Sequence, residues 1–340
     1  MPPKRTWNVL RDPLEVGGLV VFGVGLALVV AGRLDPAALL LWLVFGYVVY
    51  MARGMVRQAR RFRPVEPPRV WWVTLLGNLA LMVLGLGAFL WYMFAGGARA
   101  WVPFLVFIAG AIALRQWRAG VTARLYAWRG PALRLLQMGE YRKLVRELED
   151  DPTTPQNPDK LAMLALAYIE LNKLHKAEEL LGRARALAPN FASVNGAIGA
   201  LRRHQARWAD AVSALQKALA FEENVNTRYY LGLCQYLAGE HQAARATLRA
   251  ALQDPTLIRQ GQVMGAYLLR QMAEAEGDRE AARAWYARMA EHAPKVLPRL
   301  DEEARRHKQT PYGETLKAHV RAMQRILARR PLEAAQAQKT

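Results

Sequence analysis

The sequence predicts an all-α protein, in which a four-helix transmembrane bundle is followed by an α-solenoid with a C-terminal capping helix. Long apolar segments fill most of the first 118 residues. Between residues 158 and 294, small residues recur about every 34 positions. After residue 295 comes a single amphipathic pattern. At 340 residues, the chain is long enough for two domains.

The membrane domain is predicted over residues 1–118, with helices at 16–32, 36–52, 70–96 and 100–117. A helix rises 1.5 Å per residue, so the third segment is long enough to cross a hydrocarbon core of about 30 Å. The first two segments have about 17 residues each and are slightly short, and the fourth is marginal in length. The alternative, buried helices of a soluble protein, would require polar faces. The long third segment has none.

The positions of the basic residues predict the orientation of this domain. The loop between the second and third segments is rich in arginine, with Arg53, Arg57, Arg60, Arg61, Arg63 and Arg69. Loops of this kind stay in the cytoplasm. We therefore expect a multi-pass protein of the inner (cytoplasmic) membrane, with the N-terminus and everything after the fourth helix on the cytoplasmic side.

The formal net charge of +19 has two possible explanations, nucleic-acid binding or membrane attachment. The excess lies beside the apolar segments and in the last 46 residues, while residues 135–294 are nearly neutral. This distribution favours membrane lipid as a partner, and no nucleic acid is expected. The single cysteine, Cys234, excludes an intrachain disulfide and suits a reducing compartment.

The apolar segments contain no Asp, Glu, Lys or His that could form an ion pathway. A channel or a pump is therefore disfavoured. Gly77 and Gly85 are eight residues apart and so lie on one helix face. Small residues on one face predict close packing against another helix.

The repeats are marked by Ala177, Ala211, Ala244 and Ala282, which are spaced by 34, 33 and 38 residues. The longer last step predicts an insertion near the segment DPTLIRQ. The first unit, LAMLALAYIELNKLHKAEELLGRARALAPN, closely resembles a tetratricopeptide repeat (TPR), a 34-residue pair of helices. The resemblance implies TPR-like hairpins over 158–294, whose small residues allow close helix packing.

Residues 119–157 are predicted to form connecting helices and a partial repeat. Met138–Asp150 resembles the second half of a TPR unit, and its first half would fall at 119–137. Gly130-Pro131 is expected to bend or break that first helix.

The resemblance also implies a protein or peptide partner, bound on the concave face that the first helix of each hairpin lines. The expected partner-binding groove consists of Ala162, Leu166, Ile169, Gly196, Ala200, Arg203, Tyr229, Leu233 and Tyr236. The family's clamp for C-terminal carboxylates needs Lys, Arg and Asn. Ala162, Leu166 and Ala197 occupy the matching positions, so that activity is not expected here.

Residues 295–340 are predicted to form a capping helix and a disordered tail. The helix is expected at Glu314–Arg330 and should end at Pro331. Its apolar face is formed by Leu316, Val320, Met323 and Leu327, beside a stripe of basic residues. We expect this face to pack on the repeats and cover the last hairpin. A position in the groove or on anionic lipid is the alternative.

Catalytic, cofactor and metal-binding motifs are not recognisable in the sequence, and we expect no enzyme activity. Neither Ser193 nor Ser213 lies in a G-x-S-x-G motif. The two closest histidines, His307 and His319, are 12 residues apart, which is too far for a metal pair on one helix face.

The function expected from these observations is that of a membrane-anchored scaffold that recruits protein partners through cytoplasmic repeats. The alternative is a receptor or transporter-associated subunit, whose membrane helices bind a ligand, a lipid or another subunit. Four membrane helices exceed what anchoring alone requires, and this keeps the alternative open.

Overall fold

The computed structural model describes residues 68–95 and 102–337, and every regular element in these ranges is a helix. The predicted membrane helices 16–32 and 36–52 lie outside the described residues. The chain divides into two compact units, Met1–Trp128 and Arg129–Thr340. Each unit is described by itself below.

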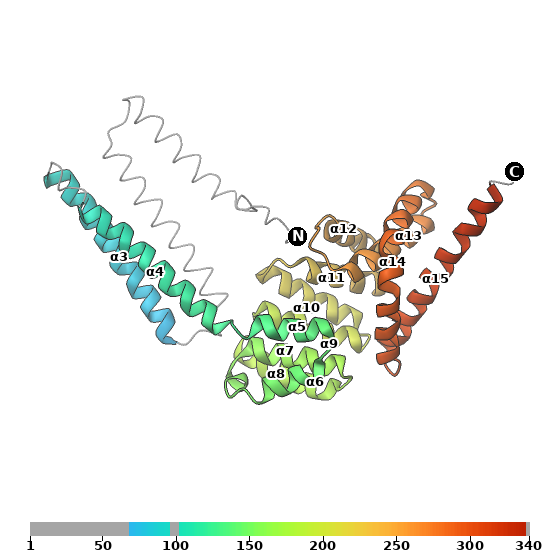
Figure 1. Ribbon diagram of the computed structural model, residues 1–340, viewed down its shortest axis with the longest axis horizontal. Coiled ribbons are helices and arrows are strands. Elements are labelled where there is room, and N and C mark those ends of the chain that lie inside the picture. Colours follow the sequence, from blue (N-terminus) through green and yellow to red (C-terminus); the bar gives the residue numbers. More distant parts are fainter. Residues whose placement is uncertain (1–67, 96–101, 338–340) are drawn as a thin grey trace, which may run out of the picture. The chain divides into compact units, whose positions relative to one another are not determined.

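The described part of the first unit is a pair of packed helices, α3 (Pro68–Ala95) and α4 (Val102–Leu125) (Figure 1). A Cβ atom added at Gly77 would lie 3.0 Å from Leu114, and one at Gly85 would lie 3.0 Å from Phe107. On the opposite helix, a Cβ at Gly110 would lie 2.9 Å from Leu81. The prediction that Gly77 and Gly85 allow close helix packing is therefore confirmed.

The predicted segments 70–96 and 100–117 thus coincide largely with α3 and α4. Within the described part of the chain, no helix combines the length and the apolar character that crossing a membrane requires.

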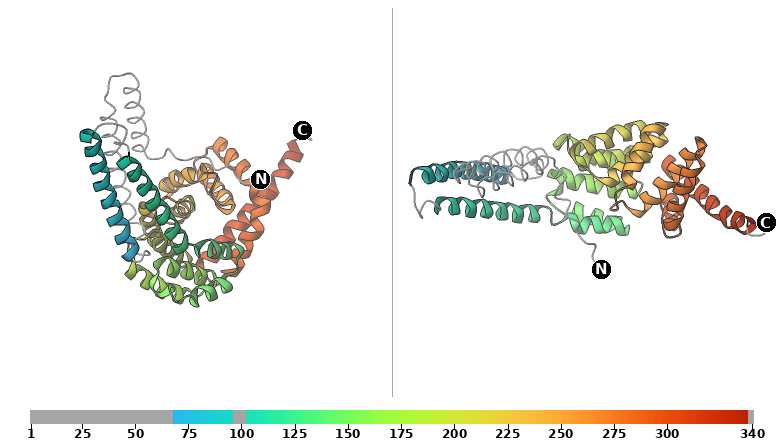
Figure 2. Two further views of the ribbon diagram at one scale, coloured as in Figure 1. Left: turned by 60° about the vertical axis from the view of Figure 1, so that its left-hand side comes forward. Right: turned by 90° about the horizontal axis from the view of Figure 1, so that it is seen from above.

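The second unit is a stack of helical hairpins that lie side by side (Figures 1 and 2). The hairpins are α5–α6, α7–α8, α9–α10, α11–α12 and α13–α14, and α15 follows them. Their bounds are α5 Arg129–Met138, α6 Tyr141–Glu149, α7 Pro158–Glu170, α8 Leu174–Leu187, α9 Ala192–His204, α10 Trp208–Phe221, α11 Val225–Leu237, α12 His241–Leu252, α13 Arg259–Ala275, α14 Arg279–Arg306 and α15 Pro311–Ala337, with a 3-10 turn at Thr154–Gln156. The stack is TPR-like, as the resemblance implied.

The hairpin turns share one backbone conformation. Each has a residue with positive φ one or two positions after the end of its first helix, and these are Gly139, Asn172, Ala206, Gly239 and Gly277. The following amide closes the turn by donating to a carbonyl five residues earlier, as Lys173 N does to Tyr168 O at 2.8 Å. Since Gly139 is in phase with the others, α5–α6 is a further hairpin of the same stack.

One predicted boundary needs correction, and one predicted insertion is located. The first helix of the partial repeat was expected from residue 119, but α4 runs to Leu125 and α5 begins at Arg129. The helix is interrupted by a turn just before Gly130-Pro131. Pro131 lies in the first turn of α5, where its missing N–H costs no hydrogen bond. The predicted insertion is found in the loop between α12 and α13, where an aspartate turn at Asp254 is followed by the buried Leu257.

The predicted small residues lie inside the hairpins. Ala177, Ala211 and Ala244 are completely buried, as expected. Gly199 and Gly232 are packed even more closely, since added Cβ atoms would lie 2.6 Å from Leu215 and 2.7 Å from Leu248. The repeat phase that the alanines predicted is therefore confirmed.

The C-terminal helices are longer than the sequence predicted. Repeat phase was expected to end at Pro294, but α14 continues through Pro294 and Pro298 to Arg306. Likewise α15 continues through Pro331 to Ala337, whereas a stop at Pro331 and a disordered tail were expected. A proline inside a helix removes one hydrogen bond. In α14, the buried side chains of Val296, Leu297 and Leu300 offset this cost.

Candidate interaction groove

The residues predicted to line the groove lie on the first helices of three consecutive hairpins, α7, α9 and α11. Five of them are buried, namely Ala162, Ile169, Arg203, Tyr229 and Leu233. The other four, Leu166, Gly196, Ala200 and Tyr236, are half-buried. Much of this surface is therefore already covered within the chain.

The first half of α15 covers part of the groove. Tyr312, Leu316, Val320 and Met323 are buried in the same apolar cluster as Tyr229 and Leu233 of α11. The expected packing of this apolar face on the repeats is therefore confirmed.

α15 packs mainly on α14, the second helix of the last hairpin, as the predicted cap requires. Its first half also reaches the groove. His319 Nδ1 lies 3.4 Å from the Tyr267 hydroxyl of α13, and its ring lies 6.4 Å from that of Tyr236 in α11. Tyr312 contacts α9 through Arg203. The first half of the helix thus contacts the first helices α9, α11 and α13 at the edge of the groove, in addition to covering α14. The space left between α11, α13, α14 and α15 is about 20 Å³, enough for one water molecule.

A buried arginine joins the groove to α15. Arg203 Nη1 donates a hydrogen bond of 2.6 Å to the Tyr312 hydroxyl, which in turn donates to Glu303 Oε1 at 2.7 Å. The guanidinium also lies over the rings of Tyr312 and Tyr230, at 4.4 and 4.6 Å from their centroids. Burial, together with the nearby charge of Glu170, raises the pKa of Glu303. A buried cation of this kind is stabilised only while its partners stay in place.

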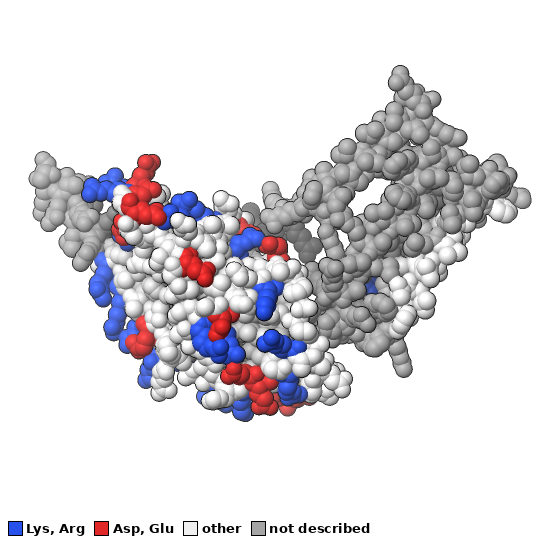
Figure 3. All heavy atoms as spheres, turned by 180° about the vertical axis from the view of Figure 1, so that it is seen from behind, with Lys and Arg blue, Asp and Glu red and all other residues white. Residues whose placement is uncertain are grey.

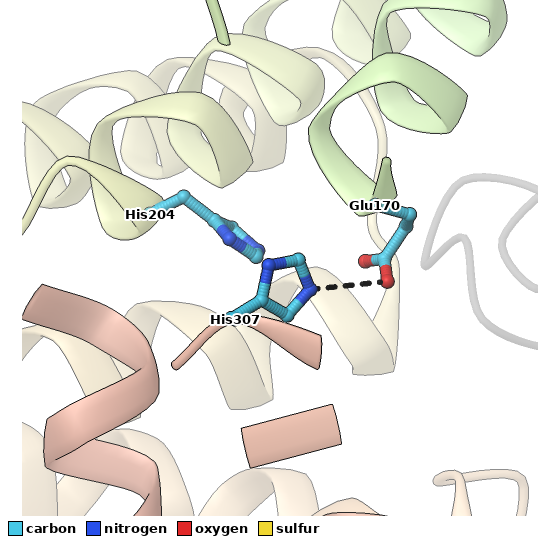
Figure 4. Close-up of side chains that lie close together, drawn as sticks. All are labelled: Glu170, His204 and His307. Atoms are coloured by element: carbon cyan, nitrogen blue, oxygen red, sulfur yellow. Dashed lines mark ion pairs between the residues drawn. The ribbon is translucent and has the colours of Figure 1, made fainter. Parts of the chain in front are cut away.

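Beside Arg203, three further groups come together at the turn between α14 and α15 (Figure 4). His307 Nε2 lies 3.5 Å from Glu170 Oε2, and the rings of His204 and His307 meet edge to face with centroids 4.5 Å apart. Burial, followed by the charge of Arg203, lowers the pKa of His204 well below its usual value. Burial would raise the pKa of Glu170, but His307, Arg203 and Arg306 lower it on balance.

Sequence reasoning did not find this cluster, because His307 is 103 residues from His204. One signal was available. Glu170 and His204 are the last residues of α7 and α9, and they are separated by 34 residues, one repeat length. They therefore occupy equivalent positions in neighbouring hairpins, and stacking brings them side by side.

The charges on the repeat surface are mixed. Figure 3 shows Lys and Arg interspersed with Asp and Glu over the helical hairpins on the face it presents, without a broad area of one sign. Several exposed pairs are in contact, such as Arg202–Glu178 at 2.8 Å and Arg305–Asp301 at 2.6 Å. This face therefore lacks the continuous basic stripe that typically contacts a nucleic-acid backbone.

Comparisons with known proteins place the chain beside repeat proteins of solved structure. No family model matches the chain, and no curated relative matches it. Among solved structures, "MamA MSR-1 C2" is 22% identical, with 51% of this chain and 98% of that chain covered and a TM-score of 0.38. The type IV pilus biogenesis factor PilW is 19% identical, with 58% and 96% covered and a TM-score of 0.42. YrrB, described as a TPR protein with an unusual peptide-binding site, is 16% identical, with 57% and 97% covered and a TM-score of 0.36.

Proposed function

We propose that this protein is a membrane-anchored, non-catalytic scaffold that binds a helical segment of a partner protein in the groove formed by α7, α9, α11 and α13. The observation that carries the proposal is the packing of α15. The first half of α15, an amphipathic helix of the same chain, already contacts the groove helices α9, α11 and α13, so their surface is suited to this kind of ligand.

The chemistry of the α15 contact defines the partner. An apolar stripe at Leu316, Val320 and Met323 is buried in the cluster that contains Tyr229 and Leu233, and one hydroxyl, that of Tyr312, satisfies the buried Arg203. Spacings of three and four residues place such groups on one helix face. A partner helix with an aromatic hydroxyl and an apolar stripe in this order would make the same contacts, after displacing α15.

Membrane attachment through residues 1–125 is supported by the described surface of α3 and α4. Both helices carry large apolar side chains that are more than half exposed, including Leu76, Leu79, Val83, Leu105 and Ile112. Monomeric soluble proteins rarely expose such a continuous apolar surface. Membrane lipid is the partner that we propose for it, in the inner membrane, with the repeats facing the cytoplasm.

The groove is tested by crosslinking in cells. A photo-crosslinking amino acid replaces Ala200, which is half-buried on the groove helix α9, in the full chain. The matched control carries it at Ser213, which is exposed on the second helix of the same hairpin, α10. A discrete crosslinked product at 200 and none at 213 would support the groove. Equal products at both positions would contradict it.

Membrane attachment is tested with reporter fusions after residues 34, 62, 98 and 135. The expected locations of the reporter are outside, inside, outside and inside. An active periplasmic reporter at 135 would refute the cytoplasmic placement of the repeats. Release of the full chain from membranes by alkaline carbonate, without detergent, would refute the anchoring itself.

The second candidate, a receptor or transporter-associated subunit, makes a different prediction. It rests on the extent of the apolar first unit, which exceeds the needs of an anchor. If the scaffold is correct, residues 129–340, the whole second unit, should alone recover the partners of the full chain. Recovery only by chains that contain the first unit would favour the receptor or subunit.

A further inference from the structure

Glu170, His204 and His307 form a compact set of metal-ligand types on three helical segments. Glu170 ends α7, His204 ends α9, and His307 directly follows α14. One ligand atom from each lies within 4.8 Å of the other two. Figure 4 shows the His307 ring between the other two side chains, with its contact to Glu170 dashed.

The imidazoles of this cluster are buried without enough hydrogen bonds. Both side chains have no exposed surface. Among the described residues, Nδ1 of His204 and Nδ1 of His307 have no hydrogen-bond partner, and Nε2 of His307 has its 3.5 Å contact with Glu170. Leaving a buried polar atom unsatisfied costs about 1–3 kcal/mol, so two such nitrogens in one place require an explanation. A bound cation would satisfy nitrogens from both rings together.

We propose that Glu170, His204 and His307 bind a divalent transition-metal ion, with Zn²⁺ as the expected species. Two imidazoles and one carboxylate suit zinc, whereas Mg²⁺ and Ca²⁺ prefer oxygen ligands alone. This inference does not depend on the proposed function of the groove.

To bind zinc, the three ligand atoms need to move only slightly closer together. Zinc bonds to nitrogen and oxygen of about 2.0–2.1 Å place tetrahedral ligands about 3.3 Å apart. The separation of 3.5 Å between His307 Nε2 and Glu170 Oε2 already matches this spacing. The remaining separations, at most 4.8 Å, need small rotations of the His204 and His307 rings. The fourth position is left for a water molecule.

Neighbouring charges determine which atoms would bind the ion. Arg203 Nη2 lies 3.4 Å from His204 Nε2, which leaves the unpartnered Nδ1 as the ligand of that ring. Arg306 Nη1 lies 3.4 Å from Glu170 Oε2 and would withdraw from it, while keeping Tyr141 and Glu302 as partners. The negative charges of Glu170 and Glu303 compensate the two arginines. The added ion is uncompensated, so weaker binding is expected than at a thiolate site.

The ion would fix the C-terminal helices on the repeats. Because its ligands come from α7, α9 and the turn between α14 and α15, bound zinc would hold this turn against two neighbouring hairpins. The start of α15, where Tyr312 meets Arg203, lies five residues further along the chain. Metal would therefore slow the opening of the turn and of the first half of α15.

The first test is a titration of the full chain, purified in detergent and stripped of metal with a chelator. Co²⁺ serves as the probe because its visible absorption reports four-coordination. One Co²⁺ per chain, displaced by Zn²⁺, is expected. His307→Ala and His204→Ala should abolish the absorption, and His292→Ala should keep it, because His292 lies on the half-exposed surface of α14. Absence of the signal in the wild-type chain, or its persistence in both ligand variants, would overturn the proposal.

A second measurement uses only the wild-type chain, in case a ligand variant fails to fold. Hydrogen exchange is compared with zinc and with chelator. Slower exchange is expected with zinc at residues 168–172, 202–206 and 303–315, and unchanged exchange at the α11–α12 turn, Ala238–Glu240. Identical exchange in the first three segments under both conditions would refute the site.

Discussion

The close approach of Gly199 to Leu215 makes the strongest test of the hairpin packing. Both residues lie inside the α9–α10 hairpin, where an added methyl group would sit 2.6 Å from Leu215 Cγ and 2.7 Å from its Cδ2. Carbon atoms normally rest about 3.5–4.0 Å apart, so Gly199→Ala forces the two helices or the leucine to move by about 1 Å. Gly196, three residues earlier on the same helix, has nothing within 4 Å of an added Cβ.

These geometries predict that the same substitution, glycine to alanine, changes the free energy of unfolding in opposite directions at the two positions. Replacing a helical glycine by alanine favours the helix by about 1 kcal/mol. Overpacking a core costs about 1–3 kcal/mol. Gly196→Ala should therefore stabilise the repeats by up to about 1 kcal/mol, and Gly199→Ala should destabilise them by up to about 2 kcal/mol.

The assay is thermal unfolding of the full chain, monitored by circular dichroism with wild-type protein as reference. In a unit of about 200 residues, 1 kcal/mol corresponds to a shift in Tm of about 2–4 °C. We expect Gly196→Ala to melt higher and Gly199→Ala to melt lower than the wild type. If Gly199→Ala melts at or above the wild type, the hairpin contact described above is wrong.

Four further predictions follow from the turns, the packing and the charges. Ala206→Gly should raise Tm, because the left-handed conformation at φ +54° costs alanine about 1–2 kcal/mol of steric strain that glycine does not have. An unchanged or lower Tm would contradict this. Ala211→Leu should cost about 1–3 kcal/mol in urea unfolding, since Ala211 is fully buried, and a neutral result would mean that the repeat phase is wrong. Removal of residues 311–340 should lower Tm and increase binding of the dye ANS by exposing the groove; if neither changes, α15 is an independent element. The hydrogen bond from Lys160, with help from Thr153, lowers the pKa of Asp151 to about 2. The contribution of Asp151 to stability is therefore present above about pH 4 and is lost as the pH falls towards about 2. Asp151→Asn should weaken this pH dependence, which urea unfolding at about pH 3 and about pH 6 measures.

Local regularity is what the sequence by itself determined. The spacing of Ala177, Ala211 and Ala244 predicts which residues lie at the hairpin crossings, because each crossing involves neighbouring helices and small residues. The same holds for Gly77 and Gly85, whose common face is set by helix periodicity alone. In both cases the determining contact is made within one hairpin, so periodicity is enough to predict it.

Only the tertiary structure decided where the C-terminal helices lie. The apolar face of α15 predicts that it is buried, but an apolar stripe does not specify which surface covers it. The pairing of Arg203 with Tyr312 joins residues 109 positions apart. Likewise, helix propensity predicts an end at Pro331, while the structure continues to Ala337.

The cluster of Glu170, His204 and His307 shows the same limit. Stacking of equivalent repeat positions brings Glu170 beside His204, and this step follows from the 34-residue period. The approach of His307 depends on how far α14 extends past its hairpin before the chain turns back. That length is set by side-chain packing over Val296, Leu297 and Leu300, which the repeat pattern does not encode.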